Sequence, residues 1–110
     1  MQTPDVHVGD KGTAFIATVY DGTTLVDLSV STVRQYKFRR PNGTTFTVSP
    51  NYLTNGKDSK LIYTASAHAE GNETVDDLNW PGIWQLQAII SFPHSTFRSN
   101  YYTFRVYRNL

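Results

Sequence analysis

Cysteine is absent from this chain of 110 residues. Its absence excludes disulfide bridges and metal sites built on thiolates. Charge is also scarce, because Asp, Glu, Lys and Arg together make up 17% of the sequence, compared with about 25% in typical soluble proteins. The isoelectric point of ≈ 8.0 does not suit a nucleic-acid-binding domain, for which clustered Lys and Arg and a value above about 9 are expected. We therefore expect no nucleic-acid partner.

Long apolar runs are missing too. No stretch of the sequence approaches the roughly 20 apolar residues of a transmembrane helix. The opening residues, MQTPDVHVGDKG, lack the basic and apolar regions of a secretory signal. We expect no contact with a membrane.

Motifs of catalysis and of cofactor binding are also absent. The sequence contains no phosphate-binding glycine loop and no nucleophile elbow. The three histidines, His7, His68 and His94, lie far apart, without the spacing of metal ligands. Asp76 and Asp77 are more simply explained as caps of the turn that follows than as a catalytic pair. We expect no enzymatic activity, no metal and no cofactor.

Aromatic residues, in contrast, are plentiful, at 14% of the chain. The segment GIWQLQAIISF, Gly82–Phe92, is apolar at every second position, as expected for a strand with one buried face. Asn42 and Gly43 lie between two alternating segments, which is a strong signal for a β-hairpin. Alternation and turn signals predict about seven strands. The others are Thr13–Tyr20, Leu25–Leu28, Val33–Arg40, the residues around Phe46 and Val48, Leu61–Thr64 and the C-terminal stretch YYTFRVYRNL.

Helices are not predicted, although the polar link Ser29–Thr32 has room for one helical turn. Ala65–Pro81 is expected to be the longest irregular stretch. Strands separated by turns, without helices, predict an all-β domain over residues 1–110 in which antiparallel sheets pack face to face. The centre of the core is expected to contain Trp84, Phe38, Tyr36, Leu86, Phe104 and Val106.

Five short motifs occur in order along the chain: VGDKGT near the start, VDLS at Val26–Ser29, FRRPNGT at Phe38–Thr44, DDLNWPGIWQLQA at Asp76–Ala88, and FRVYRNL at the end. With these motifs the chain resembles the small immunoglobulin-like domains of tailed-bacteriophage virions, and is similar to the N-terminal domain of phage baseplate upper proteins. The resemblance implies a single immunoglobulin-like antiparallel β-sandwich. It also implies a non-enzymatic structural protein of the virion, in multiple copies, that decorates or joins capsid, neck, tail or baseplate proteins.

A second function stays open beside this one. Exposed aromatic residues also suit a host-surface or carbohydrate-binding module, and Trp80 is compatible with a sugar platform, a protein contact or a cover over one end of the sandwich. The basic run KFRR, Lys37–Arg40, fits the solvent-exposed face of two strands, the rim of a protein interface or a thin nucleic-acid patch. Residues 1–8 and Ala65–Pro81 are expected to contact partners. The candidate interface residues are Val6, Val8, Arg39, Trp80, Tyr102 and Tyr107.

Overall fold

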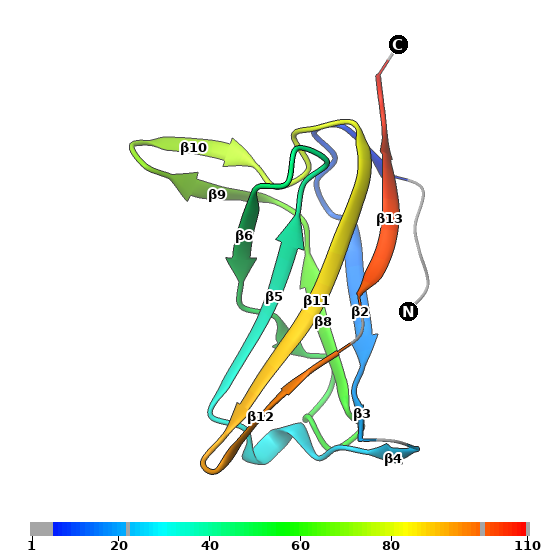
Figure 1. Cartoon of the computed structure of the whole chain (residues 1–110), viewed down its shortest axis with the longest axis vertical. Coiled ribbons are helices and arrows are strands. Elements are labelled where there is room, and N and C mark those ends of the chain that lie inside the picture. The colour runs from blue at the N-terminus through cyan, green and yellow to red at the C-terminus, as the bar shows by residue number, and fades with distance from the viewer. Residues whose placement is uncertain (1–5, 22, 100, 110) are drawn as a thin grey trace.

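The computed structural model describes residues 6–21, 23–99 and 101–109, and these form an all-β fold. Two sheets face each other across the core, with two small hairpins attached (Figure 1). The single helix among the described residues is a 3₁₀ turn, η1 (Leu28–Val30), at the polar link where one helical turn was expected. No helix in this part of the chain is long and apolar enough to cross a membrane.

The larger sheet contains six strands in the order β1-β13-β11-β5-β6, with β12 paired to the far end of β11. Its strands are β1 (Val6–His7), β5 (Val33–Arg39), β6 (Thr45–Val48), β11 (Gly82–Phe92), β12 (Ser95–Arg98) and β13 (Tyr102–Tyr107). All neighbouring strands in it are antiparallel except β1, which runs parallel to β13. The first and last strands of the domain therefore lie side by side.

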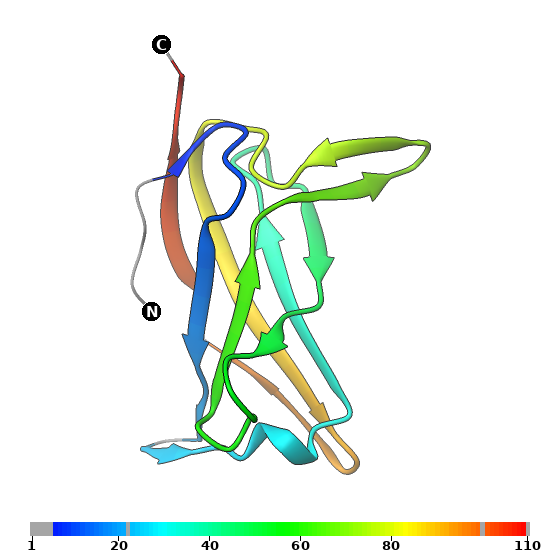
Figure 2. The same cartoon turned by 180° about the vertical axis from the view of Figure 1, so that it is seen from behind.

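The smaller sheet has three strands in the order β2-β8-β7 and lies in front in Figure 2. It consists of β2 (Ala14–Thr18), β7 (Asn51–Tyr52) and β8 (Lys60–Thr64). Two separate hairpins complete the fold: β3 (Tyr20–Asp21) with β4 (Thr24–Leu25), and β9 (Ala67–Glu70) with β10 (Glu73–Asp76). The β9–β10 hairpin projects sideways from one end of the molecule (Figures 1 and 2).

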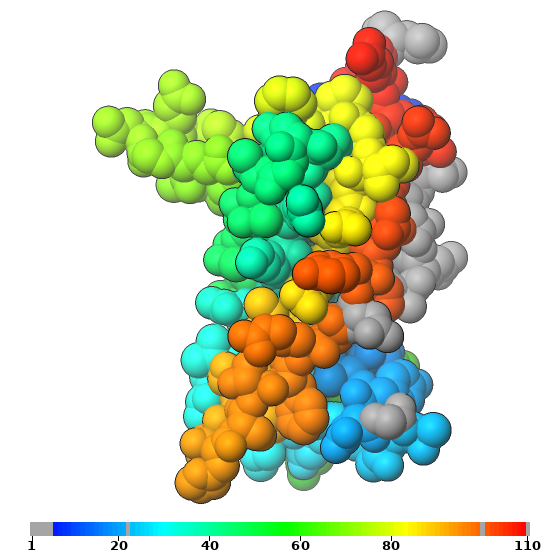
Figure 3. Space-filling model, in the orientation of Figure 1, coloured from blue at the N-terminus to red at the C-terminus, as the bar shows by residue number. Residues whose placement is uncertain are grey.

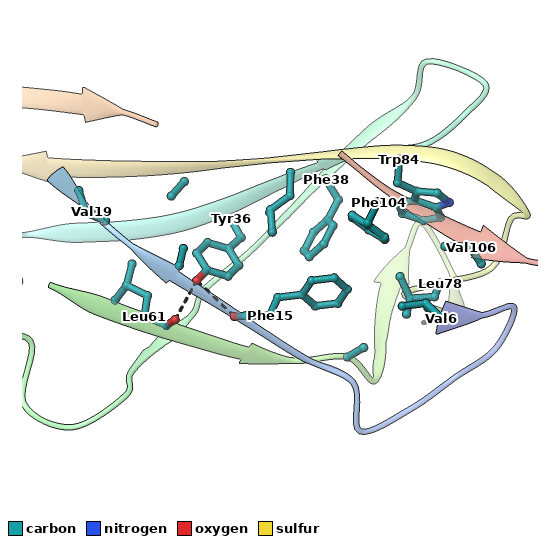
Figure 4. Close-up of a cluster of buried hydrophobic side chains, with 14 of the residues drawn as sticks. Val6, Phe15, Val19, Tyr36, Phe38, Leu61, Leu78, Trp84, Phe104 and Val106 are labelled. Carbon is teal, nitrogen blue, oxygen red and sulfur yellow. Dashed lines mark hydrogen bonds between the residues drawn. The ribbon is translucent and has the colours of Figure 1, made fainter. Parts of the chain in front are cut away.

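The core lies between the inner faces of the two sheets (Figure 4). The alternation predicted for β11 is confirmed, because Trp84, Leu86, Ala88 and Ile90 are all at most 1% exposed. The other predicted core residues, Phe38, Tyr36, Phe104 and Val106, are also buried. The Tyr36 hydroxyl lies 3.0 Å from the Leu61 carbonyl oxygen and 3.3 Å from that of Phe15, so one polar group of the larger sheet is satisfied by the smaller one.

Two glycines have conformations that the fold requires. Gly43 has φ +89° in the β5–β6 turn, which confirms the hairpin predicted at Asn42–Gly43. Gly82 has φ +127°, and a Cβ built there would come within 2.8 Å of the Pro41 ring. The glycine thus lets β11 begin directly against the β5–β6 turn, two residues before Trp84 enters the core.

Several expectations from the sequence need correction. The described residues form thirteen strands, many of them short, where about seven were expected, and Leu25–Leu28 is not one strand, because β4 ends at Leu25 and η1 begins at Leu28. Ala65–Pro81 is not irregular, because it contains the paired strands β9 and β10, with Gly71 in the turn between them. Val6 is not a docking residue, because it is 0% exposed and pairs with Val106 of β13. Residues 1–5 of the expected N-terminal contact lie outside the described residues.

Candidate binding groove at the base of the β9–β10 hairpin

A groove of about 680 Å³ lies where the β9–β10 hairpin leaves the body of the domain. Its walls come from β6, from the turn before β6, from β9 and from the loop before β11. Most of its lining is polar, with one large exposed ring, Trp80, at 46% exposure. The lining residues are Arg40, Asn42, Thr44, Thr45, Phe46, Thr47, His68, Ala69, Glu70, Asn79 and Trp80.

Asp77 is the buried centre of the contacts beneath the hairpin. Its side chain is 1% exposed, yet it accepts hydrogen bonds from the Tyr63 hydroxyl and from the Ser66 backbone N–H, and its Oδ1 lies 2.6 Å from Nδ1 of His68. A buried carboxylate is tolerated only when its oxygens are paired in this way. Asp77 therefore connects β8, the start of the hairpin and the return to β11.

Arg40 provides a second ionic contact at the same place. It follows β5 directly, its side chain is 6% exposed, and it forms an ion pair with Glu70 at the end of β9. Its guanidinium also donates to Thr44 Oγ1 at 3.1 Å and lies 4.7 Å from the ring centroid of Phe46. One buried cation thus contacts the hairpin, the β5–β6 turn and an aromatic ring.

Glu70 and Tyr63 have shifted acidities that follow from these contacts. The hydrogen bonds from His68 and then from Arg40 lower the pKa of Glu70 below its usual value, because both stabilise the carboxylate. Burial, followed by the hydrogen bond to Asp77, raises the pKa of the Tyr63 phenol above its usual value. At neutral pH, Glu70 is therefore charged and Tyr63 keeps the proton that it donates.

Aromatic packing fixes the rings around the groove. The His68 ring stacks on Phe46 with centroids 4.2 Å apart and an angle of 18° between the planes. Trp84 donates from Nε1 to the Trp80 carbonyl at 3.0 Å, so the buried indole positions the backbone that carries the exposed one. The exposed indole is therefore carried by the loop just before β11, and this hydrogen bond ties that loop to the buried ring.

Two buried polar atoms in the described part of the chain have no hydrogen-bond partner, and both belong to residues of this groove. They are Nε of Arg40 and Oδ1 of Asn79. Such atoms are few in native proteins and call for an explanation, such as a bound water or ligand. Both atoms are buried beneath the lining of the groove and are not open to a molecule in it.

His68 lies between two carboxylates at the groove. Each ring nitrogen of His68 faces a carboxylate, with Nδ1 next to Asp77 and Nε2 at 3.0 Å from Glu70. Both ring nitrogens are therefore in contact with side chains of this chain. No cluster of three or more His, Asp or Glu side chains suited to a metal occurs in the described ranges.

The six predicted interface residues do not form one patch. Arg39 and Tyr107 are exposed on the outer face of the larger sheet, whereas Trp80 lies at the groove. Val8 and Tyr102 are half-buried and pack against the core, so only part of each side chain is exposed, and Val6 is fully buried. The exposed members of the set are Arg39, Trp80 and Tyr107.

Sequence reasoning missed most of the residues beneath the hairpin. KFRR was interpreted as an exposed run, yet Arg40 is 7% exposed. Its position carried a usable signal, because Arg40 continues the inward alternation of Tyr36 and Phe38. Asp77 is expected from the sequence to cap the turn that follows, but its carboxylate accepts from the Ser66 N–H, eleven residues earlier in the chain. No local signal links Asp77 to Tyr63 on β8.

Comparisons of the chain with protein-family descriptions, with curated proteins and with solved structures found no match.

Proposed function

We propose that the domain is an immunoglobulin-like β-sandwich. In such domains one sheet contains strands B, E and D in that order, and the other contains G, F, C and, in the variable type, C′. The orders β2-β8-β7 and β13-β11-β5-β6 fit these two sheets strand for strand. On this assignment the β9–β10 hairpin is an insertion between strands E and F.

The function that the geometry supports best is that of a non-enzymatic structural component of a bacteriophage virion, which decorates or joins capsid, neck, tail or baseplate proteins in multiple copies. The carrying observation is the β9–β10 hairpin, which projects from the body and is fixed by a buried network around Asp77 and Arg40. A braced projection suits contact with a neighbouring protein, because little ordering entropy is lost on binding.

Three of the five motifs of the phage resemblance support the same proposal by their places in the fold. VDLS contains Asp27, whose Oδ1 accepts from the Ser29 N–H at 3.0 Å and caps η1. FRRPNGT makes the β5–β6 turn with Gly43, and DDLNWPGIWQLQA contains both Asp77 and the core residue Trp84. The motifs therefore coincide with the elements that determine this fold.

Particle composition tests this function. Particles purified from cultures that produce the protein are separated on a density gradient and analysed by quantitative mass spectrometry. We expect the chain in the particle fraction at several copies per particle. Recovery of the chain only from the soluble fraction contradicts the proposal.

A carbohydrate-binding function is the second candidate, favoured by the groove. Trp80 offers a flat exposed ring beside polar side chains, among them Asn42 and Thr44. A glycan array tests it, with Trp80→Ala as the variant and Tyr20→Ala as a control, because Tyr20 is also exposed, at 56%, but lies on β3. Binding that Trp80→Ala abolishes and Tyr20→Ala preserves supports a sugar site. The absence of binding by the parent protein contradicts it.

A further inference from the structure

Positive and negative charges are segregated in this domain. The six strands of the larger sheet contain five Lys or Arg residues, namely Arg34, Lys37, Arg39, Arg98 and Arg105, and no Asp or Glu. The β9–β10 hairpin shows the opposite, with Glu70, Glu73 and Asp76 and no Lys or Arg. A net charge of only +1 therefore conceals two surfaces of opposite sign.

Strand register gathers three of the cations on the outer face of the larger sheet. Arg39 pairs with Gln85, and Arg105 pairs with Ile83 of the same strand, β11. Lys37 lies two residues from Arg39, which is about 7 Å along a strand, and β13 lies two strand spacings from β5, which is about 10 Å. We call Lys37, Arg39 and Arg105 the basic face.

The basic face is exposed, and its charges are not neutralised by the part of the chain that the structure describes. All three side chains are exposed, and none forms an ion pair with a described carboxylate. A hollow of about 120 Å³ lies between Lys37 and Arg39, and Tyr101 forms part of its wall. Ile83 and Tyr107, at 51% and 44% exposure, add apolar surface nearby. The face thus combines cations with exposed rings, a composition favoured at protein interfaces.

The hairpin offers the complementary surface but does not reach the basic face of its own chain. The outer face of the larger sheet is turned toward the viewer in Figure 3, and the hairpin extends sideways beyond its edge. Glu73 is exposed at the start of β10 and has no ion pair with any described residue. Asp76 forms a single exposed contact with Lys11, at 3.5 Å. The exposed acids of the hairpin are therefore available to another molecule.

We propose that the β9–β10 hairpin of one copy docks on the basic face of a second copy, with Glu73 beside Lys37 and Arg39. The two surfaces lie on different parts of the chain, so copies can join head-to-tail, and each bound copy then offers another free hairpin and another free face. Such heterologous contacts build rings or open rows. The partner of the exposed hairpin is thus a second copy of this chain.

This contact is expected to be weak and sensitive to salt. The hairpin has four residues in each strand, so it covers less surface than the area of about 800 Å² that each partner buries in a standard interface. Exposed charges are largely screened beyond about 3 Å at 1 M salt, compared with about 10 Å at 0.1 M. Head-to-tail rows therefore form when many copies are concentrated, as on the surface of a particle.

Sedimentation velocity on the purified chain tests the proposal. The parent protein is expected to show a sedimentation coefficient that rises continuously with concentration at 50 mM salt and returns to that of the monomer at 500 mM. The Lys37→Glu/Arg39→Glu variant and the Glu73→Lys variant are each expected to associate at least ~10-fold more weakly, because like charges then face each other. Lys57→Glu and Asp21→Lys, which make the same types of charge change elsewhere, are expected to behave as the parent.

Mixing the two interface variants is the decisive step. Each variant alone places like charges opposite each other, whereas in the mixture both kinds of hairpin-to-face contact join opposite charges, so the proposed contact predicts that the mixture regains the salt-sensitive association that neither variant shows alone. A parent protein that stays monomeric at millimolar concentration in low salt overturns the proposal. A different result assigns the basic face to nucleic acid instead. In that case the parent protein does not self-associate but binds a DNA duplex in a salt-dependent way, and only the double variant loses this binding. Sedimentation measures the purified chain alone. A negative result therefore contradicts self-association but does not decide whether the chain is a virion protein, which is tested by particle composition.

Discussion

Replacement of Asp77 by alanine tests whether the buried network holds the β9–β10 hairpin on the body. The substitution leaves the Tyr63 hydroxyl, the Ser66 N–H and the His68 ring without their acceptor. Hydrogen bonds to charged groups each contribute about 1.5–3 kcal/mol, and breaking a buried pair by removing one partner costs about 3–5 kcal/mol. We therefore expect Asp77→Ala to lower the free energy of unfolding by about 3–5 kcal/mol.

Asparagine at position 77 gives an intermediate case. It retains a carbonyl oxygen for Tyr63 and Ser66 but places an NH₂ group beside His68, so we expect a loss of about 1–2 kcal/mol. Asp76→Ala is the matched control, because the neighbouring carboxylate is 44% exposed and makes one surface contact with Lys11. Its expected effect is within about 0.5 kcal/mol, the usual range for an exposed pair.

Urea unfolding at pH 7, followed by tryptophan fluorescence, measures all three variants. A 110-residue domain is expected to have a total stability of about 5–15 kcal/mol, so the loss in Asp77→Ala shifts the unfolding midpoint strongly if m is unchanged. Equal midpoints for Asp77→Ala and Asp76→Ala refute the reasoning. The β9–β10 hairpin would then be held on the body by contacts other than those of Asp77.

Three further predictions concern the core, the β11 start and pH. Trp84→Ala should lower the free energy of unfolding by about 3–5 kcal/mol in the same urea assay, whereas Trp80→Ala, at an exposed position, should change it little. Similar losses of stability in the two variants would contradict a core centred on Trp84. Gly82→Ala should lower the melting temperature more than Gly12→Ala, because both glycines have positive φ but only Gly82 faces a proline ring at 2.8 Å; equal losses would show that this close approach is unimportant. Because the pKa of Glu70 is lower in the folded state than its ordinary value of 4.5, the ionised Glu70 side chain stabilises the fold above pH 4.5. This stabilisation should be lost as the pH falls below 4.5 and through the lowered pKa. Unfolding measured from pH 7 to 3 should show a weaker decline for Glu70→Gln, and an unchanged decline would contradict the assigned contacts.

Much of the sheet structure could be predicted because it follows from a period of two. β11 alternates over eleven residues, so its buried side was evident without any partner strand. The turn at Asn42–Gly43 could also be predicted, because a tight hairpin needs residues that accept positive φ. These signals are local, which is why they survive in the sequence alone.

The β9–β10 hairpin could not be predicted in the same way. Each of its strands has four residues, and none of them is fully buried, so no alternating apolar pattern marks them. Its stability depends on contacts between residues distant in sequence, such as Arg40 with Glu70. Tyr102 was different, because it shares the inward alternation of Phe104 and Val106, and that signal argued against an interface role.

The central claim is that this domain functions by contact with other virion proteins, and a cryo-electron microscopy map of the particle tests it most directly. The account predicts density for the two-sheet domain on the particle, in several adjacent copies, with the β9–β10 hairpin covered by a neighbouring protein chain. A map in which the domain is missing, or in which it stands at a tip with the hairpin and the Trp80 groove both open to solvent, would contradict the account.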